Sequence, residues 1–178
     1  MPKYSKDINL IVTSEMSQGM IDKATSPRDK FMVAIMDFSG ARPDELTRLK
    51  KKDINLRADG CLEIKLHTDK LGNENVFLIK DRILTMRPEM HFFDIIKNYW
   101  ATSNVETLLS LTVRRIEQII EQLSDGKLCP YNFRHSRLTK LARTGATLDQ
   151  LMYWKGANDP RSVGAYIRGK RVEFDKIE

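Results

Sequence analysis

The chain has 178 residues and a mass of 20.6 kDa; 41% of its residues are hydrophobic and 30% are charged. This length and composition are typical of one globular domain, and they exclude collagen-like, low-complexity and wholly disordered chains. The longest apolar run, Phe31 to Met36, is too short to cross a membrane, and the N-terminus lacks the apolar core of a signal peptide. We therefore expect a cytoplasmic protein with no membrane partner.

The cysteines and histidines do not form a pattern that binds metal. Cys61 and Cys129 are far apart, and no Cys or His stands near either of them at ligand spacing. The three histidines form no HxxxH or HExxH pair. The sequence thus indicates a reducing compartment and predicts neither a disulfide framework nor a zinc site, and we expect no metal and no cofactor.

The net charge of +6 is concentrated near the C-terminus. Residues 126–172 carry ten Lys and Arg against two Asp, a net charge of +8, so the rest of the chain is slightly acidic. Five aromatic residues lie within this basic segment: Tyr131, Phe133, Tyr153, Trp154 and Tyr166. Such a segment is typical of a polyanion-binding surface, most simply for double-stranded DNA. A solvated helical surface accounts for the charge equally well, so charge alone does not decide the function.

The first part of the chain reads as three helices. Thr13 or Ser14 is a candidate N-cap for the first helix. Pro27 begins the second, whose apolar residues recur at helical spacing until Gly40 ends it. The third runs from about Pro43 to Lys50, with Leu46 and Leu49 facing inward.

The middle of the chain changes to a two-residue period. Residues 61–66 alternate polar and apolar, and residues 76–79 form a second short strand-like run. Residues 69–73 form the turn between them, which gives a β-hairpin, or a meander of three strands if residues 54–56 join it. Of these two, we expect the small antiparallel sheet of three strands.

The remaining segments read as helices separated by caps. One begins at Pro88, one is capped by Thr112, and a third covers residues 132–143; Leu148, Leu151 and Met152 form the apolar side of the next, between Thr147 and Gly156. A last helix around residues 163–167 precedes a charged tail. The fold class is therefore α+β and mainly helical, with residues 1–178 expected to form a single domain.

Four segments carry candidate chemistry: Gly40-Ala41-Arg42-Pro43-Asp44-Glu45-Leu46, Tyr131-Asn132-Phe133-Arg134-His135, Trp154-Lys155-Gly156-Ala157-Asn158, and Tyr166. An Arg at a helix start can bind a phosphate with its fork of N–H donors and the free helix amides. Each segment alone is equally compatible with an ordinary surface or packing position. Their combination and their order along the chain are far more specific for one function than any single segment.

In combination these segments resemble the catalytic domain of the tyrosine recombinase (phage integrase) family. That family has G-x-R-x-x-E-L after a helix pair, a lysine on the turn of a small sheet, H-x-x-R-H at a helix start, and a nucleophilic tyrosine nine residues after a His or Trp. The matching residues are Arg42, Lys70, Arg134 and Tyr166, and the match covers about residues 10–170. Lys65 and Lys80 flank the turn, whose position favours Lys70.

The resemblance implies DNA cleavage and rejoining without metal or ATP. Tyr166 would attack the phosphodiester and form a 3′-phosphotyrosine, while Arg42 and Arg134 would stabilise the charge on the non-bridging oxygens. Lys70 would protonate the leaving 5′-oxygen as general acid. The implied protein is a site-specific recombinase or integrase that assembles as a tetramer on DNA and has no small-molecule substrate.

The sequence departs from the family pattern at two motif positions. Tyr131 replaces the usual His, and Ala157 replaces the usual His or Trp. Tyr131 keeps a hydroxyl for the scissile phosphate, and Asn158 and Lys155 are weaker candidates for the donor that Ala157 lacks. His135 matches a position whose role in the family is structural. Some archaeal viral and plasmid integrases also vary at the first of these positions, which suggests a virus or mobile element as the source.

The resemblance also bears on domain organisation and assembly. The family usually carries an N-terminal helical DNA-clamp domain, for which this sequence shows no counterpart. Its C-terminal segment commonly docks on a neighbouring protomer, so we expect the tail to dock in trans through Phe174 on DNA, and to be mobile or packed in cis without it.

Three alternatives stay open at the sequence level. The first is a catalytically impaired DNA-binding module on the same scaffold, against which the combination of Arg42, Lys70, Arg134 and Tyr166 argues. The second is a helical protein-interaction domain whose basic face is only solvated. The third is a type IB topoisomerase, which shares the same chemistry and is only weakly excluded.

Overall fold

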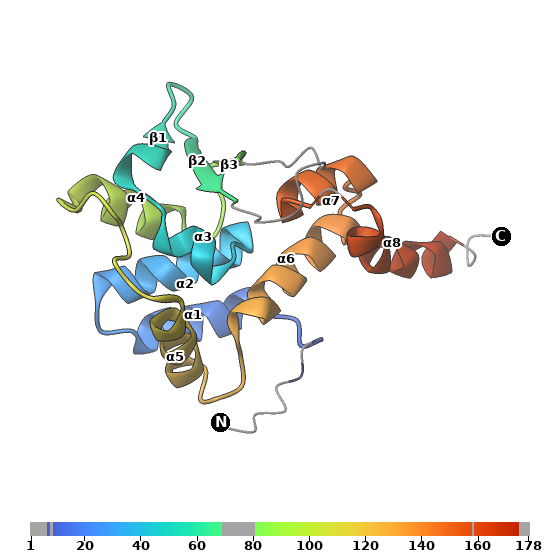
Figure 1. Cartoon of the computed structure of the whole chain (residues 1–178), viewed down its shortest axis with the longest axis horizontal. Coiled ribbons are helices and arrows are strands. Elements are labelled where there is room, and N and C mark those ends of the chain that lie inside the picture. Colours follow the sequence, from blue (N-terminus) through green and yellow to red (C-terminus); the bar gives the residue numbers. More distant parts are fainter. Residues whose placement is uncertain (1–6, 8, 69–80, 158, 175–178) are drawn as a thin grey trace, which may run out of the picture.

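The computed structural model describes residues 7, 9–68, 81–157 and 159–174, with residues 168–174 described only by the course of their helix. The described part is mainly helical with one small sheet, as the sequence predicts. Figure 1 shows the sheet at the upper left above the N-terminal helices. The helix at residues 130–143 runs through the middle, and the last two helices lie at the right.

Helix α1 (Ser14–Lys23) and helix α2 (Pro27–Ser39) begin where the capping residues predict. The side chains of Thr13 and Ser26 each accept a hydrogen bond from a backbone N–H in the first turn of their helix. All residues from Phe31 to Met36 are fully buried, so α2 is the central helix of the main core. Residues 31–36 are apolar on all sides of the helix, so this stretch needs burial on every side.

Helix α3 (Pro43–Thr47) is shorter than predicted. Leu46 and Leu49 are buried as expected, but Lys50 leaves the helix and forms an isolated β-bridge with Thr107. A 3-10 turn, η1 (Lys51–Asp53), then leads into the sheet. The contact between Lys50 and Thr107 therefore ends α3 earlier than the spacing of its apolar residues predicts.

The sheet contains β1 (Ile54–Leu56), β2 (Leu62–His67) and β3 (Asp81–Met86), antiparallel in that order. The predicted alternation in β2 is confirmed. Strand β2 pairs with β1 on one side, and on the other with residues 81–86, a strand that the sequence pattern did not predict. The predicted strand at residues 76–79, the turn at 69–73 and Lys70 lie outside the described residues.

Helix α4 (Phe93–Thr102) begins later than the predicted start at Pro88, because Phe92 has a positive φ of 66° and precedes the helix. Helix α5 (Val113–Leu123) has its predicted cap, Thr112, and buries Ile116, Ile119 and Ile120. Val113, the first residue of α5, is 39% exposed.

Helices α6 (Pro130–Arg143), α7 (Leu148–Lys155) and α8 (Arg161–Phe174) share a second small core. Leu138, Leu151 and Val163 are its buried centre, and Trp154 packs against both this core and the main one. Leu148 was expected inside but is exposed. Helix α8 also includes the start of the predicted tail. No helix in the described ranges is long and apolar enough to cross a membrane.

Candidate active site

Arg42 lies at the N-terminus of α3, directly after the end of α2. Gly40 ends α2 with φ 58°, a conformation that favours glycine, and the chain reverses within two residues. The backbone N–H of Arg42 donates to Oε2 of Glu45 at 2.7 Å. This bond sets the start of α3, and the Arg42 side chain is 30% exposed. A partly exposed guanidinium is therefore held on a short, well-anchored turn.

Arg134 lies in α6 and is almost fully buried. Its Nη1 donates to the carbonyl of Gly40 at 3.1 Å, and its Nη2 donates to the carbonyl of Lys155. Burial, with help from the charges of Arg42 and Arg82, lowers the pKa of Arg134 to about 10. Arg134 thus remains charged at neutral pH and ties together the ends of α2 and α7.

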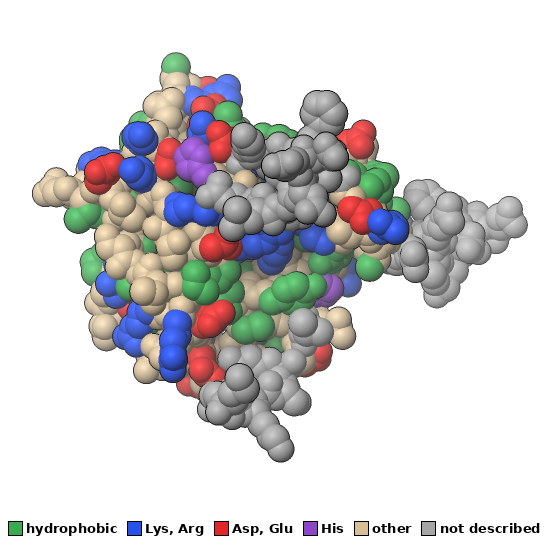
Figure 2. Space-filling view, in the orientation of Figure 1, with side chains coloured by type: hydrophobic (Ala, Val, Ile, Leu, Met, Phe, Trp, Pro, Cys, Tyr) green, Lys and Arg blue, Asp and Glu red, His purple; other side chains and the backbone are tan. Residues whose placement is uncertain are grey.

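A cavity of about 410 Å³ brings three basic side chains and one phenol together. Arg42 directly precedes α3, Arg134 lies in α6 and Lys155 ends α7, while Tyr131 lies in the first turn of α6. Acidic residues on the wall are Asp44 and Glu117. Figure 2 shows Lys and Arg side chains gathered in the middle of the face, between the sheet and the last helices. Such a concave basic site suits one phosphate group.

Tyr166 lines a second cavity of about 560 Å³, together with His135 and Arg143. Tyr131 and Lys155 line both cavities and therefore stand between them. The structure places Tyr166 next to the cavity of Arg42 and Arg134 and not on its wall.

The Tyr166 ring packs in an aromatic group. The centroids of His135 and Tyr166 are 5.4 Å apart, and those of Tyr131 and His135 are 6.2 Å apart. Burial, and then the charge of and hydrogen bonding with Tyr131, raise the pKa of Tyr166 to about 12. Burial lowers the pKa of His135, so its imidazole is neutral at neutral pH. The phenol of Tyr166 is consequently protonated in this state.

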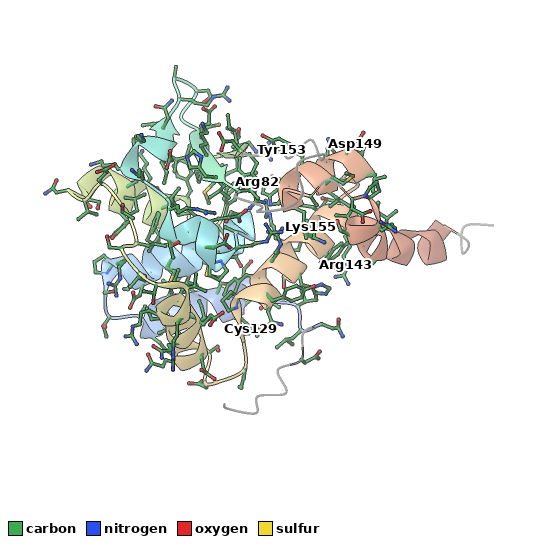
Figure 3. All side chains as sticks on the ribbon, viewed as in Figure 1. Arg82, Cys129, Arg143, Asp149, Tyr153 and Lys155 are labelled. Carbon is green, nitrogen blue, oxygen red and sulfur yellow. The ribbon has the colours of Figure 1, made fainter. Side chains whose placement is uncertain are left out.

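Lys155 joins the end of α7 to the start of α8. Its Nζ donates to the carbonyl of Ser162 and lies 5.8 Å from the centroid of the Tyr166 ring. Its own carbonyl accepts from Arg134. Figure 3 shows Lys155 between α6 and α7, with Arg143 farther along α6. Lys155 therefore contacts the helix of the proposed nucleophile as well as the arginine cavity.

The structure brings five of the seven candidate residues into one region: Arg42, Tyr131, Arg134, Lys155 and Tyr166. Lys70 and Asn158 lie outside the described residues. Ala157 is buried, and its backbone N–H donates to the carbonyl of Met152 at 2.9 Å. It follows Gly156, the C-cap of α7.

Sequence reasoning missed the residues that hold the arginines. Glu45 was noted only as a motif letter, yet it is buried and accepts hydrogen bonds from three residues. Arg82, fully buried in β3, gave no local signal, since nothing near it in the sequence is its partner. Trp154 donates from Nε1 to the carbonyl of Ser39, which joins α7 to α2.

Comparisons with known proteins show relatives in sequence and in fold. No protein-family model matches the chain. It is similar to the tyrosine recombinase XerD of Staphylococcus saprophyticus, with 21% identity over 188 residues covering 99% of this chain. The chain spans 63% of the length of that relative.

Solved structures are similar over nearly the whole chain. XerA recombinase aligns with a TM-score of 0.70 and 18% identity, covering 95% of this chain and 66% of that one. The chain has the fold of a tyrosine recombinase catalytic domain. The catalytic domain of bacteriophage HP1 integrase shares this recombinase fold at a TM-score of 0.64 and 13% identity, covering 94% of this chain and 95% of that one. XerH bound to a palindromic difH substrate, in a post-cleavage complex, gives a TM-score of 0.71 and 18% identity, covering 95% of this chain and 53% of that one.

Within the described ranges, no group of three or more His, Cys, Asp or Glu residues could hold a metal ion.

Proposed function

We propose that the chain is a site-specific DNA recombinase, with residues 1–178 as its catalytic unit. It would cleave and rejoin double-stranded DNA through a 3′-phosphotyrosine, as one member of a tetramer on DNA. The observation that carries the proposal is the cavity lined by Arg42, Arg134 and Lys155, with Tyr166 on the adjoining cavity.

In the proposed reaction, a phosphodiester binds between Arg42 and Arg134. The phenolate oxygen of Tyr166 attacks phosphorus, and the bond from phosphorus to the 5′-oxygen breaks. The leaving 5′-oxygen takes a proton from Lys70, and the two guanidinium groups stabilise the charge on the non-bridging oxygens. Attack by the 5′-hydroxyl of another strand then releases Tyr166 and joins the exchanged strands.

The DNA-free geometry requires Tyr166 to move toward the arginines before attack. Tyr131 and Lys155 form the wall that it passes, so both are placed to contact the same phosphate. The Tyr131 side chain is 46% exposed and can donate a hydrogen bond from its hydroxyl. We assign Tyr131 this role in place of the usual histidine, with Lys155 and Asn158 as secondary donors.

Structures of two similar proteins contain DNA. XerH is bound to its difH substrate, and the Tn1549 transposon integrase is in complex with transposon right end DNA. These complexes support double-stranded DNA as the partner of this chain.

A catalytically impaired DNA-binding module is the second candidate. Both terminal nitrogens of Arg134 already donate to backbone carbonyls, and the pKa of Tyr166 is about 12. An arginine that only anchors the backbone and a tyrosine that never ionises would leave a protein that binds DNA without cutting it.

Covalent capture separates the two candidates. The substrate is a pool of duplexes of randomised sequence in which a bridging 5′-phosphorothiolate replaces one phosphodiester, so that a thiol leaves and rejoining is blocked. The wild-type protein should form a denaturant-resistant adduct, read by denaturing electrophoresis, and Tyr166→Phe should form none. Tyr153→Phe is the matched control, because Tyr153 lies in the same basic segment and lines neither cavity.

An adduct that survives Tyr166→Phe would remove Tyr166 from the mechanism. No wild-type adduct, together with salt-sensitive binding to the same pool, would favour the binding module.

A further inference from the structure

Arg82 is a fully buried arginine on β3 for which the proposed reaction has no role. Its Nη2 forms an ion pair with Oε2 of Glu45 at 2.5 Å, and its Nη1 donates to the carbonyl of Trp154. Its Nε has no hydrogen-bond partner among the described residues. The ion pair with Glu45 is what allows this buried charge to persist. A buried ion pair adds little to stability compared with apolar residues, so the presence of Arg82 here calls for another explanation.

Glu45 is also in contact with Arg42. Its Oε2 accepts the backbone N–H of Arg42, its Oε1 accepts the hydroxyl of Thr68 at 2.8 Å, and its side chain is fully buried. The Nη1 of Arg42 lies 3.9 Å from Oε1, at the outer limit of an ion pair. One buried carboxylate therefore lies between two guanidinium groups, and it is closer to that of Arg82.

The region carries more positive than negative charge. Arg42, Arg82 and Arg134 surround Glu45, and burial together with the charge of Arg42 lowers the pKa of Arg82. Since Arg82 is fully buried and Arg42 is 30% exposed, Arg42 is the one whose guanidinium reaches the cavity.

We propose that Arg82 is a positioning residue. Its ion pair with the carboxylate of Glu45 leaves the guanidinium of Arg42 available to bind a phosphate in the cavity. Without the charge of Arg82, the buried carboxylate would draw Arg42 inward into a close ion pair. This inference rests on the proposed function, because it gives Arg42 a phosphate to bind.

The second contact of Arg82 extends the same role. The carbonyls of Trp154 and Lys155 are adjacent at the end of α7; Arg82 binds the first and Arg134 binds the second. Figure 3 shows Arg82 between the sheet and this end of α7. Gly156 follows in a left-handed conformation, and a Cβ there would lie 3.5 Å from Nε of Arg82 and 3.2 Å from Oγ1 of Thr68. Arg82 thus connects the turn of Arg42 with the helix end that holds Arg134.

The test measures the reactivity of Arg42 itself, without DNA. Phenylglyoxal modifies accessible arginines, and peptide mass spectrometry reports the rate at each position, with exposed Arg87 as the internal reference. In the wild-type protein Arg42 should react and should be protected by inorganic phosphate. Arg82→Met should slow its modification by about tenfold or more, because a close ion pair with Glu45 shields it.

A charge-balanced variant distinguishes this role from simple loss of structure. Arg82→Met combined with Glu45→Gln removes both charges and should return Arg42 to within about twofold of the wild-type rate, even though stability is not restored. Arg82→Gln keeps an N–H donor for Glu45 and loses only the charge, so it replaces Arg82→Met if that variant does not fold. Thermal melts followed by circular dichroism confirm folding.

An unchanged Arg42 rate in the folded single variant, or a slow rate that persists in the double variant, would overturn the inference. Failure of the wild-type protein to form a DNA adduct would instead count against the proposed function and would leave the Arg42 comparison valid.

Discussion

At the scale of single residues, the proposed nucleophile is in an environment that opposes its ionisation. With a pKa of about 12, only about one Tyr166 in 10⁵ is a phenolate at neutral pH. The raised pKa moves phenolate formation to higher pH, so cleavage should increase with pH through the alkaline range. Tyr131→His should raise the rate near neutral pH, because an imidazole accepts the proton there. Single-turnover cleavage from pH 6 to 10 measures both effects. A flat profile with no gain from the histidine would contradict this account.

Alanine variants of Arg42 and Arg134 should affect DNA cleavage much more than DNA binding. Arg42→Ala and Arg134→Ala should each reduce cleavage by about 10²-fold or more, as for a lost donor to a charged transition state. DNA affinity should change much less, as measured by fluorescence anisotropy at one salt concentration. Arg134→Ala should also lower stability, because it leaves the carbonyls of Gly40 and Lys155 without their partner. An equal fall in affinity and cleavage would make these residues phosphate anchors and favour the binding module.

The candidate site could be predicted from the sequence only in part, for a physical reason visible at this scale. Arg42, Arg134 and Tyr166 stand in motifs whose residue types and spacing predict the proposed chemistry. Arg82 stands at an inward position of β3, where an apolar residue is the expectation. Its partner Glu45 is 37 residues away in the chain, so no local sequence pattern predicts the ion pair. Such a pair between distant buried charges can be identified only once the three-dimensional structure is known.

At the scale of elements, local signals predicted helix starts and ends where one side chain or one glycine decides them. Thr13, Thr112 and Thr147 cap their helices as predicted, and the second helix begins at Pro27 as predicted. The strand at residues 81–86 was missed because Arg82 interrupts its apolar face. The end of α3 was predicted too late in the chain, because Lys50 forms a β-bridge with Thr107 instead of continuing the helix. The errors thus fall where tertiary contacts override local preference.

The turn between α2 and α3 offers a test of how an element supports the site. Gly40 has φ 58°, and a Cβ there would lie 3.2 Å from Cα of Arg134 and 3.1 Å from Cβ of Arg137. Gly40→Ala should therefore lower the free energy of unfolding by about 1–2 kcal/mol or more, and displace the carbonyl that binds Arg134. Urea denaturation measures the first effect and single-turnover cleavage the second.

Gly19→Ala is the matched control for that change. Gly19 lies within α1 and a Cβ there meets nothing within 4 Å, so this variant should be more stable by roughly 0.5–1 kcal/mol. Equal stability of the two alanine variants would show that the turn does not depend on glycine.

At the scale of the whole molecule, the helix that carries Tyr166 also leads into the C-terminal tail. Helix α8 continues through Phe174, so the described tail residues extend the helix of the nucleophile. A short segment of this kind is not stable alone and needs a surface to pack on. We propose that this surface lies on a neighbouring protomer, as the resemblance to tyrosine recombinases implies. Docking there would couple one active site to the next through α8 and its contact with Lys155.

We therefore expect the protein to be a monomer without DNA and to assemble on DNA through this tail. Truncation after Lys170 should leave binding to a single site intact, because the basic cavity and its arginines remain. It should weaken assembly on DNA with two sites, measured by gel shift and light scattering. Phe174→Ala should reproduce the defect in part, which separates the proposed contact from a general effect of shortening α8. Synapsis that is unchanged by truncation would show that the protomers couple through another surface.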